Sequence, residues 1–315
     1  MSNTSTLPQS TVNPFRLIET ILTWVNITKR LAKSGIVFLV LISVLSGFLI
    51  GSPVDTGVNF IDLGLTLFGI LFLAGGASAL NQVQEVEIDS RMNRTKNRPI
   101  PNGEITKRNA AILSVGSIIA GTLIVGFVDW QLMILGVLAV VFYNGLYTMW
   151  WKKKMAFAAI PGAIPGALPI LMGYVAASHS LFDPAGYYLF LILFVWQMPH
   201  FWVLAIRYKD DYKSGGIPTL PVARGDKTTL QHICIWQIAY ILSALIAPLF
   251  LPVGIPYVLF SIVTGGYLLY LTHLYVMKSP EKNWLKFFLG VNFSLIGYLT
   301  VLVLDVWRNS FIALH

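Results

Sequence analysis

Long apolar runs separated by short basic segments are the feature that most constrains this chain. Only 11% of the 315 residues are charged and 56% are apolar, whereas an average soluble domain is about 25% charged. So few charges cannot cover a soluble surface of this size, which excludes a soluble enzyme. A net charge of +8 is also typical of nucleic-acid-binding proteins, but here the basic residues lie in clusters between apolar runs. The pattern predicts a polytopic membrane protein that binds no nucleic acid.

Nine apolar runs are long enough to cross a bilayer, since a spanning helix needs about 20 apolar residues. They cover residues 34–52, 60–80, 109–128, 131–150, 156–177, 186–206, 230–251, 254–276 and 287–305. With nine spans, all but one of the 22 Lys and Arg residues fall on one side of the membrane, and only Arg308 falls on the other. Because short basic loops stay in the cytoplasm, the sequence predicts a cytoplasmic N-terminus and an external C-terminus.

The spans divide the chain into four segments. Residues 1–13 are polar and are predicted to form a disordered tail. Residues 14–31 place their apolar side chains on one helical face, which predicts an interfacial helix; an extension of the first span is the alternative. Residues 32–306 are predicted to form a single nine-helix transmembrane domain, and residues 307–315 an external tail.

Polar residues gather in the long cytoplasmic loop after the second span. If the helix continues past residue 80, Asn81, Glu85 and Asp89 lie four residues apart on one face, and Glu87 points away from it. Carboxylate and amide oxygens can bind Mg²⁺ together with substrate phosphates. The basic residues that follow, which can neutralise a phosphate-bearing ligand, are Arg94, Lys96 and Arg98. An ordinary helix end with solvated ion pairs is the alternative.

A second pair of acids lies in the cytoplasmic loop after the sixth span. Asp210 and Asp211 are adjacent, so at most one of them is expected to bind a metal directly. Lys209 and Lys213 flank them. Because the second and sixth spans end on the same side, the two acidic loops can face each other and hold two Mg²⁺ ions around one diphosphate. A solvated loop is the alternative.

Glycine and proline interrupt the fifth predicted span, residues 156–177. Gly162 and Gly166 form a small-x-x-x-small pair, which is typical of a close helix crossing. The prolines between and around them kink the helix, and a kinked helix inside a membrane often borders a cavity. Both interpretations can hold together.

An aromatic cluster surrounds His200 in the sixth span. Trp196, Phe201 and Trp202 are its neighbours along the chain. Aromatic packing is one interpretation of the cluster. A wall for a flat macrocycle, with the histidine near its iron, is the other.

Together these motifs resemble the UbiA superfamily of membrane prenyltransferases, and within it the branch of protohaem IX farnesyltransferases, or haem O synthases. The resemblance covers residues 25–305. It rests on the stripe of Asn81, Glu85 and Asp89, on residues 94–103, on Tyr147, Thr148 and the lysines after them, and on residues 196–202, 207–212 and 216–221. The stripe is shared by the superfamily, and residues 196–221 are specific to the haem branch. The chain departs from the family pattern at Ser34, Gly35, Val86, Met155 and Thr219.

The resemblance implies an all-α, UbiA-type bundle and a reaction. A farnesyl group would pass from farnesyl diphosphate to a vinyl group of haem b, giving haem O and diphosphate, a step toward haem A for terminal oxidases. Mg²⁺ would be the cofactor, and the active site would face the cytoplasm from a bacterial inner membrane. Haem A synthase or an oxidase assembly factor is the implied protein partner, beside the lipid bilayer.

The resemblance also implies roles for individual residues. The metal ligands, which are the catalytic residues, would be Asn81, Glu85, Asp89 and Asp211. The substrate contacts would be Arg94, Lys96, Arg98, Tyr147, Lys152, Lys153, Trp196, His200 and Lys209.

Two other functions stay open beside this one. A prenyltransferase of the same superfamily could act on an aromatic quinone precursor, and residues 196–221 distinguish the haem branch from it. A non-catalytic carrier of haem or isoprenoid would need no metal and no acids in two facing loops.

Overall fold

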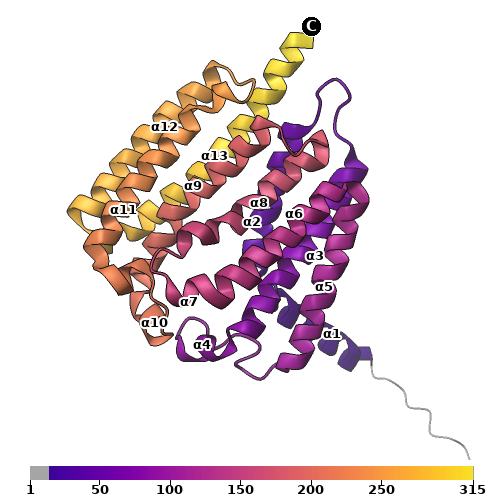
Figure 1. Cartoon of the computed structure of the whole chain (residues 1–315), viewed down its shortest axis with the longest axis vertical. Coiled ribbons are helices and arrows are strands. Elements are labelled where there is room, and N and C mark those ends of the chain that lie inside the picture. Colours follow the sequence, from indigo (N-terminus) through magenta and orange to yellow (C-terminus); the bar gives the residue numbers. More distant parts are fainter. Residues whose placement is uncertain (1–13, 315) are drawn as a thin grey trace, which may run out of the picture.

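The computed structural model describes residues 14–314, with the side chains of residues 18–309 and of Ile312. Within this range every regular element is a helix (Figure 1), as the sequence predicts. The predicted disordered tail, residues 1–13, lies outside the described residues.

Thirteen α-helices and three short helical segments of other types follow one another along the chain. They are α1 (Pro14–Leu31), α2 (Ser34–Gly51), α3 (Phe60–Gln84), α4 (Val86–Arg91), α5 (Lys107–Val128), α6 (Trp130–Val140), η1 (Val141–Trp151), α7 (Lys152–Lys154), α8 (Ala159–Ser178), α9 (Pro184–Arg207), α10 (Lys209–Ser214), α11 (Leu220–Leu245), η2 (Ala247–Leu249), α12 (Ile255–His273), η3 (Leu274–Lys278) and α13 (Pro280–Leu314).

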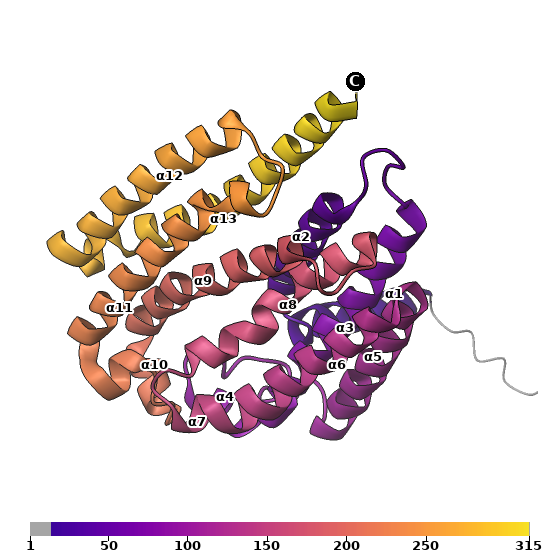
Figure 2. The ribbon, with the colours of Figure 1, turned by 45° about the horizontal axis from the view of Figure 1, so that its top comes forward.

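Eight helical segments of the described chain are long and apolar enough to cross a membrane, and they coincide with eight of the nine predicted runs. The ninth run, residues 230–251, lies mostly in α11. This helix carries Gln231, His232 and Gln237, whose polar side chains lower its mean hydropathy. It nevertheless packs against α9 and α12 inside the same bundle (Figure 2). The count of nine spans is therefore approximate, with eight supported by composition.

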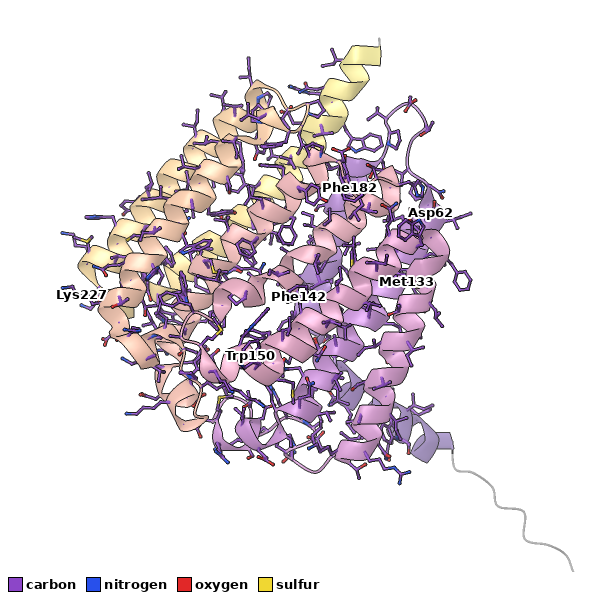
Figure 3. All side chains as sticks on the ribbon, in the orientation of Figure 1. Asp62, Met133, Phe142, Trp150, Phe182 and Lys227 are labelled. Carbon is purple, nitrogen blue, oxygen red and sulfur yellow. The ribbon has the colours of Figure 1, made fainter. Side chains whose placement is uncertain are left out.

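Two buried apolar clusters meet at α8. The larger cluster joins α8 to α9, α11, α12 and α13, and the other joins α8 to α2, α3, α5 and α6. Large apolar side chains also project from the outer faces of the bundle (Figure 3). Phe38, Val263 and Phe293 are each more than 60% exposed. Because apolar residues on an outer surface suit a lipid environment, this distribution agrees with a membrane-embedded bundle.

Close packing of α2 on α8 depends on two glycines. A Cβ atom at Gly47 would collide with the carbonyl oxygen of Ile170, and one at Gly173 would collide with that of Val44. Small residues let membrane helices approach closely enough for their backbones to touch. This contact fixes the position of α8, which forms a wall of the cavity described below.

Both predicted flanking segments are helical where the structure describes them. Helix α1 has the bounds predicted for the interfacial helix, and its apolar Ile18, Ile21 and Leu22 are more than half exposed. Its position at the membrane interface remains a prediction. Helix α13 continues to Leu314, so residues 307–314 extend the last helix instead of forming a separate tail. Trp307 ties this extension to α2, since its Nε1 donates to the carbonyl of Leu49 at 2.8 Å.

The short helices α4, α7 and α10 and the end of α1 lie together at one end of the bundle, opposite the C-terminus (Figure 1). These elements contain most of the predicted cytoplasmic loops. The fold thus gathers the polar loops around a single end.

Candidate active site

A cavity of about 410 Å³ lies among α2, α3, α8, α9 and the segment η1, and it reaches the end of the bundle where α4 and α7 lie. Along α3, its lining changes from Asn81 at the polar end to Ile70 at the apolar end. Ile36 of α2 also lines the cavity and is 58% exposed, so one wall borders the outer surface of the bundle. The cavity therefore joins a charged mouth to an apolar chamber.

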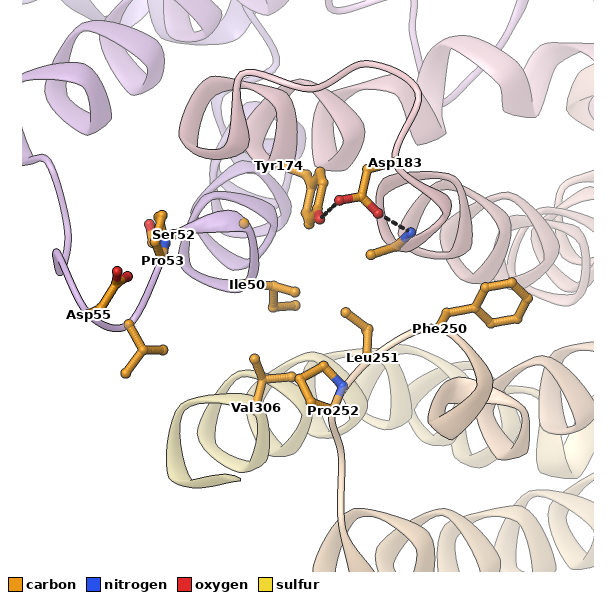
Figure 4. A pocket seen from close by; sticks show the side chains of 13 residues that line it. Ile50, Ser52, Pro53, Asp55, Tyr174, Asp183, Phe250, Leu251, Pro252 and Val306 are labelled. Atoms are coloured by element: carbon orange, nitrogen blue, oxygen red, sulfur yellow. Dashed lines mark hydrogen bonds between the residues drawn. The ribbon is translucent and has the colours of Figure 1, made fainter. Parts of the chain in front are cut away.

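A second hollow, of about 530 Å³, lies at the other end of the bundle (Figure 4). It is lined by Asp55 and Asp183 and by no Lys, Arg or His residue. Asp183 accepts hydrogen bonds from the Tyr174 hydroxyl at 2.6 Å and from the Ala185 amide at 2.9 Å. A lining with acids and no bases would repel a diphosphate, so this larger hollow is not the candidate active site.

The predicted acidic stripe lines the cavity, although the helix that carries it is not continuous. Helix α3 ends at Gln84, and Glu85 has φ −107° and ψ 12° before α4 begins. The amide of Glu85 still donates to the carbonyl of Asn81 at 3.0 Å, and that of Asp89 to the carbonyl of Glu85 at 2.8 Å. These bonds keep the four-residue spacing across the break. Asn81, Glu85 and Asp89 line the cavity, whereas Glu87 is exposed.

Each member of the stripe is paired with a basic side chain. Lys152 donates to both oxygens of Glu85, at 2.7 and 2.8 Å, and Arg98 contacts Asp89 Oδ2 at 2.6 Å. The other oxygen of Asp89, Oδ1, is buried and has no hydrogen-bond partner among the described residues. A buried carboxylate oxygen without a partner is costly, which makes it a natural position for a cation.

Lys33 is a cavity residue that the sequence analysis did not assign to the site. It adopts a left-handed conformation between α1 and α2 (φ 53°, ψ 55°), and its Nζ donates to Asn81 Oδ1 at 2.7 Å. Burial, together with the nearby positive charges of Arg98 and Lys152, lowers the pKa of Lys33 to about 7. The sequence signals for Lys33 are its place directly before the first predicted span and its position in the family motif from which Ser34 and Gly35 depart.

Positive charge exceeds negative charge in the cavity. Four basic side chains line it, those of Lys33, Arg94, Arg98 and Lys152, against the two carboxylates of Glu85 and Asp89. Within a low-dielectric site such an excess favours an anionic ligand. Arg94, Arg98 and Lys152 are thus placed as predicted for contacts to phosphate groups.

Three other predicted basic contacts lie away from the cavity. Lys96 is exposed and donates to Asn93 Oδ1 at 3.1 Å. Lys209 forms an ion pair with Asp226 at 2.9 Å. Lys153 is not among the lining residues. The runs of Lys and Arg in the sequence do not show which of these side chains line the cavity.

Asp211 lies at the contact between the two acidic loops, but it does not line the cavity. Its carboxylate accepts hydrogen bonds from the backbone amides of Asn93 and Arg94, at 3.3 and 3.1 Å. The two loops therefore face each other as expected, with Asp211 holding the loop that carries Arg94. The Arg94 guanidinium lies over the rings of Tyr208 and Tyr212, at 4.9 and 5.6 Å from their centroids.

The described residues contain no group of three or more His, Cys, Asp or Glu side chains placed to hold a metal ion. The predicted four-ligand set of Asn81, Glu85, Asp89 and Asp211 is thus not assembled in this arrangement. Asn81, Glu85 and Asp89 nevertheless provide hard oxygen ligands at one end of one cavity, which is the donor chemistry that Mg²⁺ prefers.

His200 lines the cavity on the α9 side. Its ring stacks on Trp196, with centroids 4.7 Å apart, and lies 5.2 Å from the ring of Phe288. Its Nδ1 atom is buried without a hydrogen-bond partner in the described part of the chain. Trp196 itself lies behind the histidine, and its Nε1 donates to the Val291 carbonyl at 2.8 Å. The cluster both packs and leaves one ring nitrogen free.

Helix α8 is continuous across its prolines. It borders the cavity through its glycine and proline face, as one of the two interpretations predicts. The ring of Tyr147 lies on Gly162, where a Cβ atom would be 2.6 Å from it. The amide of Gln197 fills the space beside Gly166, and its Nε2 donates to the carbonyls of Ala163 and Leu193. Gln197 also lines the cavity, and the sequence analysis did not single it out from its aromatic neighbours.

Sequence comparison relates the chain to membrane prenyltransferases. The profile of the UbiA prenyltransferase family matches residues 40–296. The chain is 43% identical over 282 residues to a protoheme IX farnesyltransferase of Bdellovibrio bacteriovorus, covering 90% of this chain and 97% of that protein. It is 36% identical to a protoheme IX farnesyltransferase of Aquifex aeolicus, covering 87% of this chain and 93% of that one.

Structural comparison gives the same fold at low identity. A digeranylgeranylglyceryl phosphate synthase matches with a TM-score of 0.75 and 18% identity, covering 90% of this chain and 99% of its own. A UbiA homolog from Archaeoglobus fulgidus bound to GPP and Mg²⁺ matches with a TM-score of 0.62 and 14% identity, covering 88% and 99%. At these identities the likeness concerns the fold alone.

Proposed function

The chain belongs to the UbiA prenyltransferase family, and within that family we propose that it is a protohaem IX farnesyltransferase. It transfers the farnesyl group of farnesyl diphosphate to a vinyl group of haem b, which gives haem O and diphosphate. The observation that carries this proposal is one cavity with a cationic mouth and an apolar chamber, in a chain whose curated relatives are protoheme IX farnesyltransferases. Those relatives favour haem over an aromatic quinone precursor as the acceptor.

The mouth of the cavity binds the diphosphate. Arg94, Arg98 and Lys152 line it, and charge-assisted hydrogen bonds from such groups to phosphate are strong. Two of these bases, Arg98 and Lys152, form ion pairs with Asp89 and Glu85. Binding of the diphosphate draws them toward the phosphate oxygens and frees the carboxylates.

The freed carboxylates, with Asn81, would hold Mg²⁺. The unpartnered Oδ1 of Asp89 and the carboxylate of Glu85 fit this role. When bound, the ion stabilises the negative charge that develops on the leaving diphosphate. Asp211 acts indirectly in this proposal, since it holds the backbone of Asn93 and Arg94 at the mouth.

The chamber protects a reactive intermediate. Cleavage of the allylic C–O bond leaves a delocalised farnesyl cation, which water would quench. Ile70, Leu73 and Met172 line the deep part of the cavity and are nearly fully buried, so the prenyl chain lies where water is scarce. The electron-rich vinyl group of haem then attacks the cation, and water completes the product.

His200 is proposed to contact haem in this chamber. Its unpartnered Nδ1 and its stacked neighbours Trp196 and Phe288 form a flat wall beside the cavity. Either the porphyrin face or its iron can meet such a wall. The wall would then orient one vinyl group toward the farnesyl carbon that reacts.

The His200→Phe variant tests this contact, because it keeps the ring and removes its nitrogens. We expect haem affinity and the rate of farnesylated haem formation each to fall roughly tenfold, the loss expected for one directional contact. Haem titration followed by visible absorption and product assay measure the two effects. Unchanged affinity and rate would leave His200 a packing residue without affecting the transferase assignment.

The direct test of the function uses purified protein in lipid with farnesyl diphosphate, haem b and Mg²⁺. Farnesylated haem should form, as judged by mass spectrometry of the extracted porphyrin. Prenylation of a hydroxybenzoate or naphthoate in place of haem would identify the alternative acceptor. Binding of either substrate without any transfer would identify a carrier.

The orientation in the membrane is a further part of the proposal. All but one of the Lys and Arg residues lie in loops or ends assigned to one side. This distribution supports a mouth that opens at the cytoplasmic face of a bacterial inner membrane. A reporter fused after His315 should be active only when it is exported. Activity of a cytoplasm-dependent reporter at this position would reject the topology. Product haem O would leave toward haem A synthase, and an oxidase assembly factor is a second candidate partner.

A further inference from the structure

A threonine at the start of α11 does not cap its helix. Thr219 occupies the N-cap position of α11 (Leu220–Leu245), where a threonine side chain normally accepts a hydrogen bond from an amide of the first turn. Here the side chain makes no capping bond. Pro221 has no backbone N–H, so one of the amides that could donate to the threonine hydroxyl is missing. Thr219 is only 6% exposed, and its Oγ1 has no partner among the described residues. A buried hydroxyl without a partner needs an explanation.

A small pocket lies beside Thr219. It has a volume of about 10 Å³ and is lined by Thr219, Lys152, Tyr147 and Tyr212, among others. A space of about 10–15 Å³ is the minimum that holds one water molecule, which also needs two to four polar partners. The volume of the pocket reaches the lower end of this range, and Thr219, Lys152, Tyr147 and Tyr212 bring polar side chains to its lining. The pocket is too small for any part of a prenyl chain or a porphyrin.

The pocket adjoins the candidate active site. Tyr147, Lys152, Phe201 and Tyr212 line both the small pocket and the large cavity, so the two spaces share a wall. The Lys152 ammonium has three N–H donors, and Glu85 accepts two hydrogen bonds from it. With Glu85, or later a phosphate group, taking two of these donors, one donor remains to hold a water molecule at the edge of the reaction chamber.

We propose that this pocket holds the water molecule that adds to the haem-derived cation, with Thr219 and Lys152 as its positioning residues. The inference rests on the proposed farnesyl transfer to haem. Attack of the vinyl group on the farnesyl cation forms a C–C bond and leaves a positive charge on the carbon next to the porphyrin ring. That cation can lose a proton to give an alkene, or it can accept water to give an alcohol.

The pocket determines which of these fates prevails. A lone pair of the water oxygen forms the new C–O bond, and the water then loses one proton. The departing diphosphate, which the reaction itself supplies, is the base that accepts it. No oxidant or reductant is needed, since addition of water and loss of a proton balance the charge. A water molecule already held beside the cation reacts before a proton is lost.

The Thr219→Val variant tests the proposal, because it keeps the shape of the side chain and removes the hydroxyl. We expect the ratio of alkene to alcohol product to rise roughly tenfold, in line with the loss of one hydrogen bond to the water. Diphosphate release should stay near the wild-type rate, since cleavage of farnesyl diphosphate precedes hydration. Mass spectrometry separates the two products, which differ by one water.

Two control variants separate a role in hydration from a role in packing. Thr219→Ser keeps a hydroxyl and should restore the wild-type product ratio. Thr229→Val removes a buried hydroxyl from the part of α11 that follows its break at Gly225. This hydroxyl already donates to the Gly225 carbonyl at 2.9 Å, so the variant should not change the ratio. An unchanged ratio in Thr219→Val, or a change of equal size in Thr229→Val, would overturn the inference.

An experimental structure of the wild-type protein in lipid provides a second measurement that does not depend on a stable variant. It should show an ordered water within hydrogen-bond distance of Thr219 Oγ1 and Lys152 Nζ, and an empty pocket would overturn the inference. If the wild-type protein made no farnesylated haem, the proposed function would fail first and the inference with it. If the wild-type protein made farnesylated haem and Thr219→Val had the same ratio of alkene to alcohol product, only the inference would fail.

Discussion

Replacement of Glu85 or Asp89 is expected to abolish farnesyl transfer, whereas replacement of Glu87 is expected to leave it nearly unchanged. Glu85→Gln and Asp89→Asn keep the size of each side chain and remove its negative charge. Both carboxylates line the cationic mouth, and Glu87 is exposed. Because the stabilisation of a leaving diphosphate by preorganised charge is a large part of such catalysis, we expect a loss of about 10³-fold or more in turnover.

The measurement is the rate of farnesylated haem formation by purified protein, with thermal stability as a check on folding. Glu87→Gln is the matched control, since it makes the same chemical change two residues from either acid. A loss of activity in Glu87→Gln equal to that in the other two variants would place the catalytic acids elsewhere in the segment. Full activity in Asp89→Asn would show that its unpartnered oxygen has no part in the reaction.

The stripe of acids shows how far the sequence predicts this site. The four-residue spacing correctly placed Asn81, Glu85 and Asp89 on one side, because backbone hydrogen bonds preserve that spacing even across a break. It did not predict the break at Glu85 itself. Arg98 and Thr95 both bind Asp89 from the following loop, and contacts of this kind depend on tertiary structure rather than on local helical periodicity.

The second acidic loop shows where sequence reasoning stops. The second and sixth predicted spans end on the same side of the membrane, so the sequence predicts that the two acidic loops meet. The direction of the Asp211 side chain cannot be predicted in the same way, because it depends on two free amides, those of Asn93 and Arg94. The contact of Lys33 with Asn81 is not predictable from the sequence for a similar reason. It depends on the left-handed conformation of Lys33 before α2.

The spans were more predictable than the site because they follow from composition. Apolar length alone identifies most of them, and the distribution of Lys and Arg orders them. The exception, α11, is a helix whose polar residues lower its mean hydropathy, and its inclusion depends on packing against α9 and α12. Thr219 directly precedes this helix without capping it, and a pattern of hydropathy cannot reveal that.

Removal of divalent metal is expected to abolish transfer as completely as loss of the acids, at about 10³-fold or more. Without a metal ion, Glu85 and Asp89 keep their ion pairs with Lys152 and Arg98, so the two bases are less free to bind the diphosphate. A chelator should therefore stop product formation, and added Mg²⁺ should restore it. The rate of farnesylated haem formation measures both steps.

The Asp89→Asn variant links this effect to the cavity. If Asp89 holds the metal, the variant's residual activity should need a higher Mg²⁺ concentration for its half-maximal rate, while Glu87→Gln should need the wild-type concentration. Haem binding should persist in the chelator, because its proposed contacts at His200 lie on α9, away from the acids. Full transfer in the presence of chelator would leave the basic residues alone to stabilise the leaving diphosphate, and the role of the carboxylates would then be limited to positioning Lys152 and Arg98.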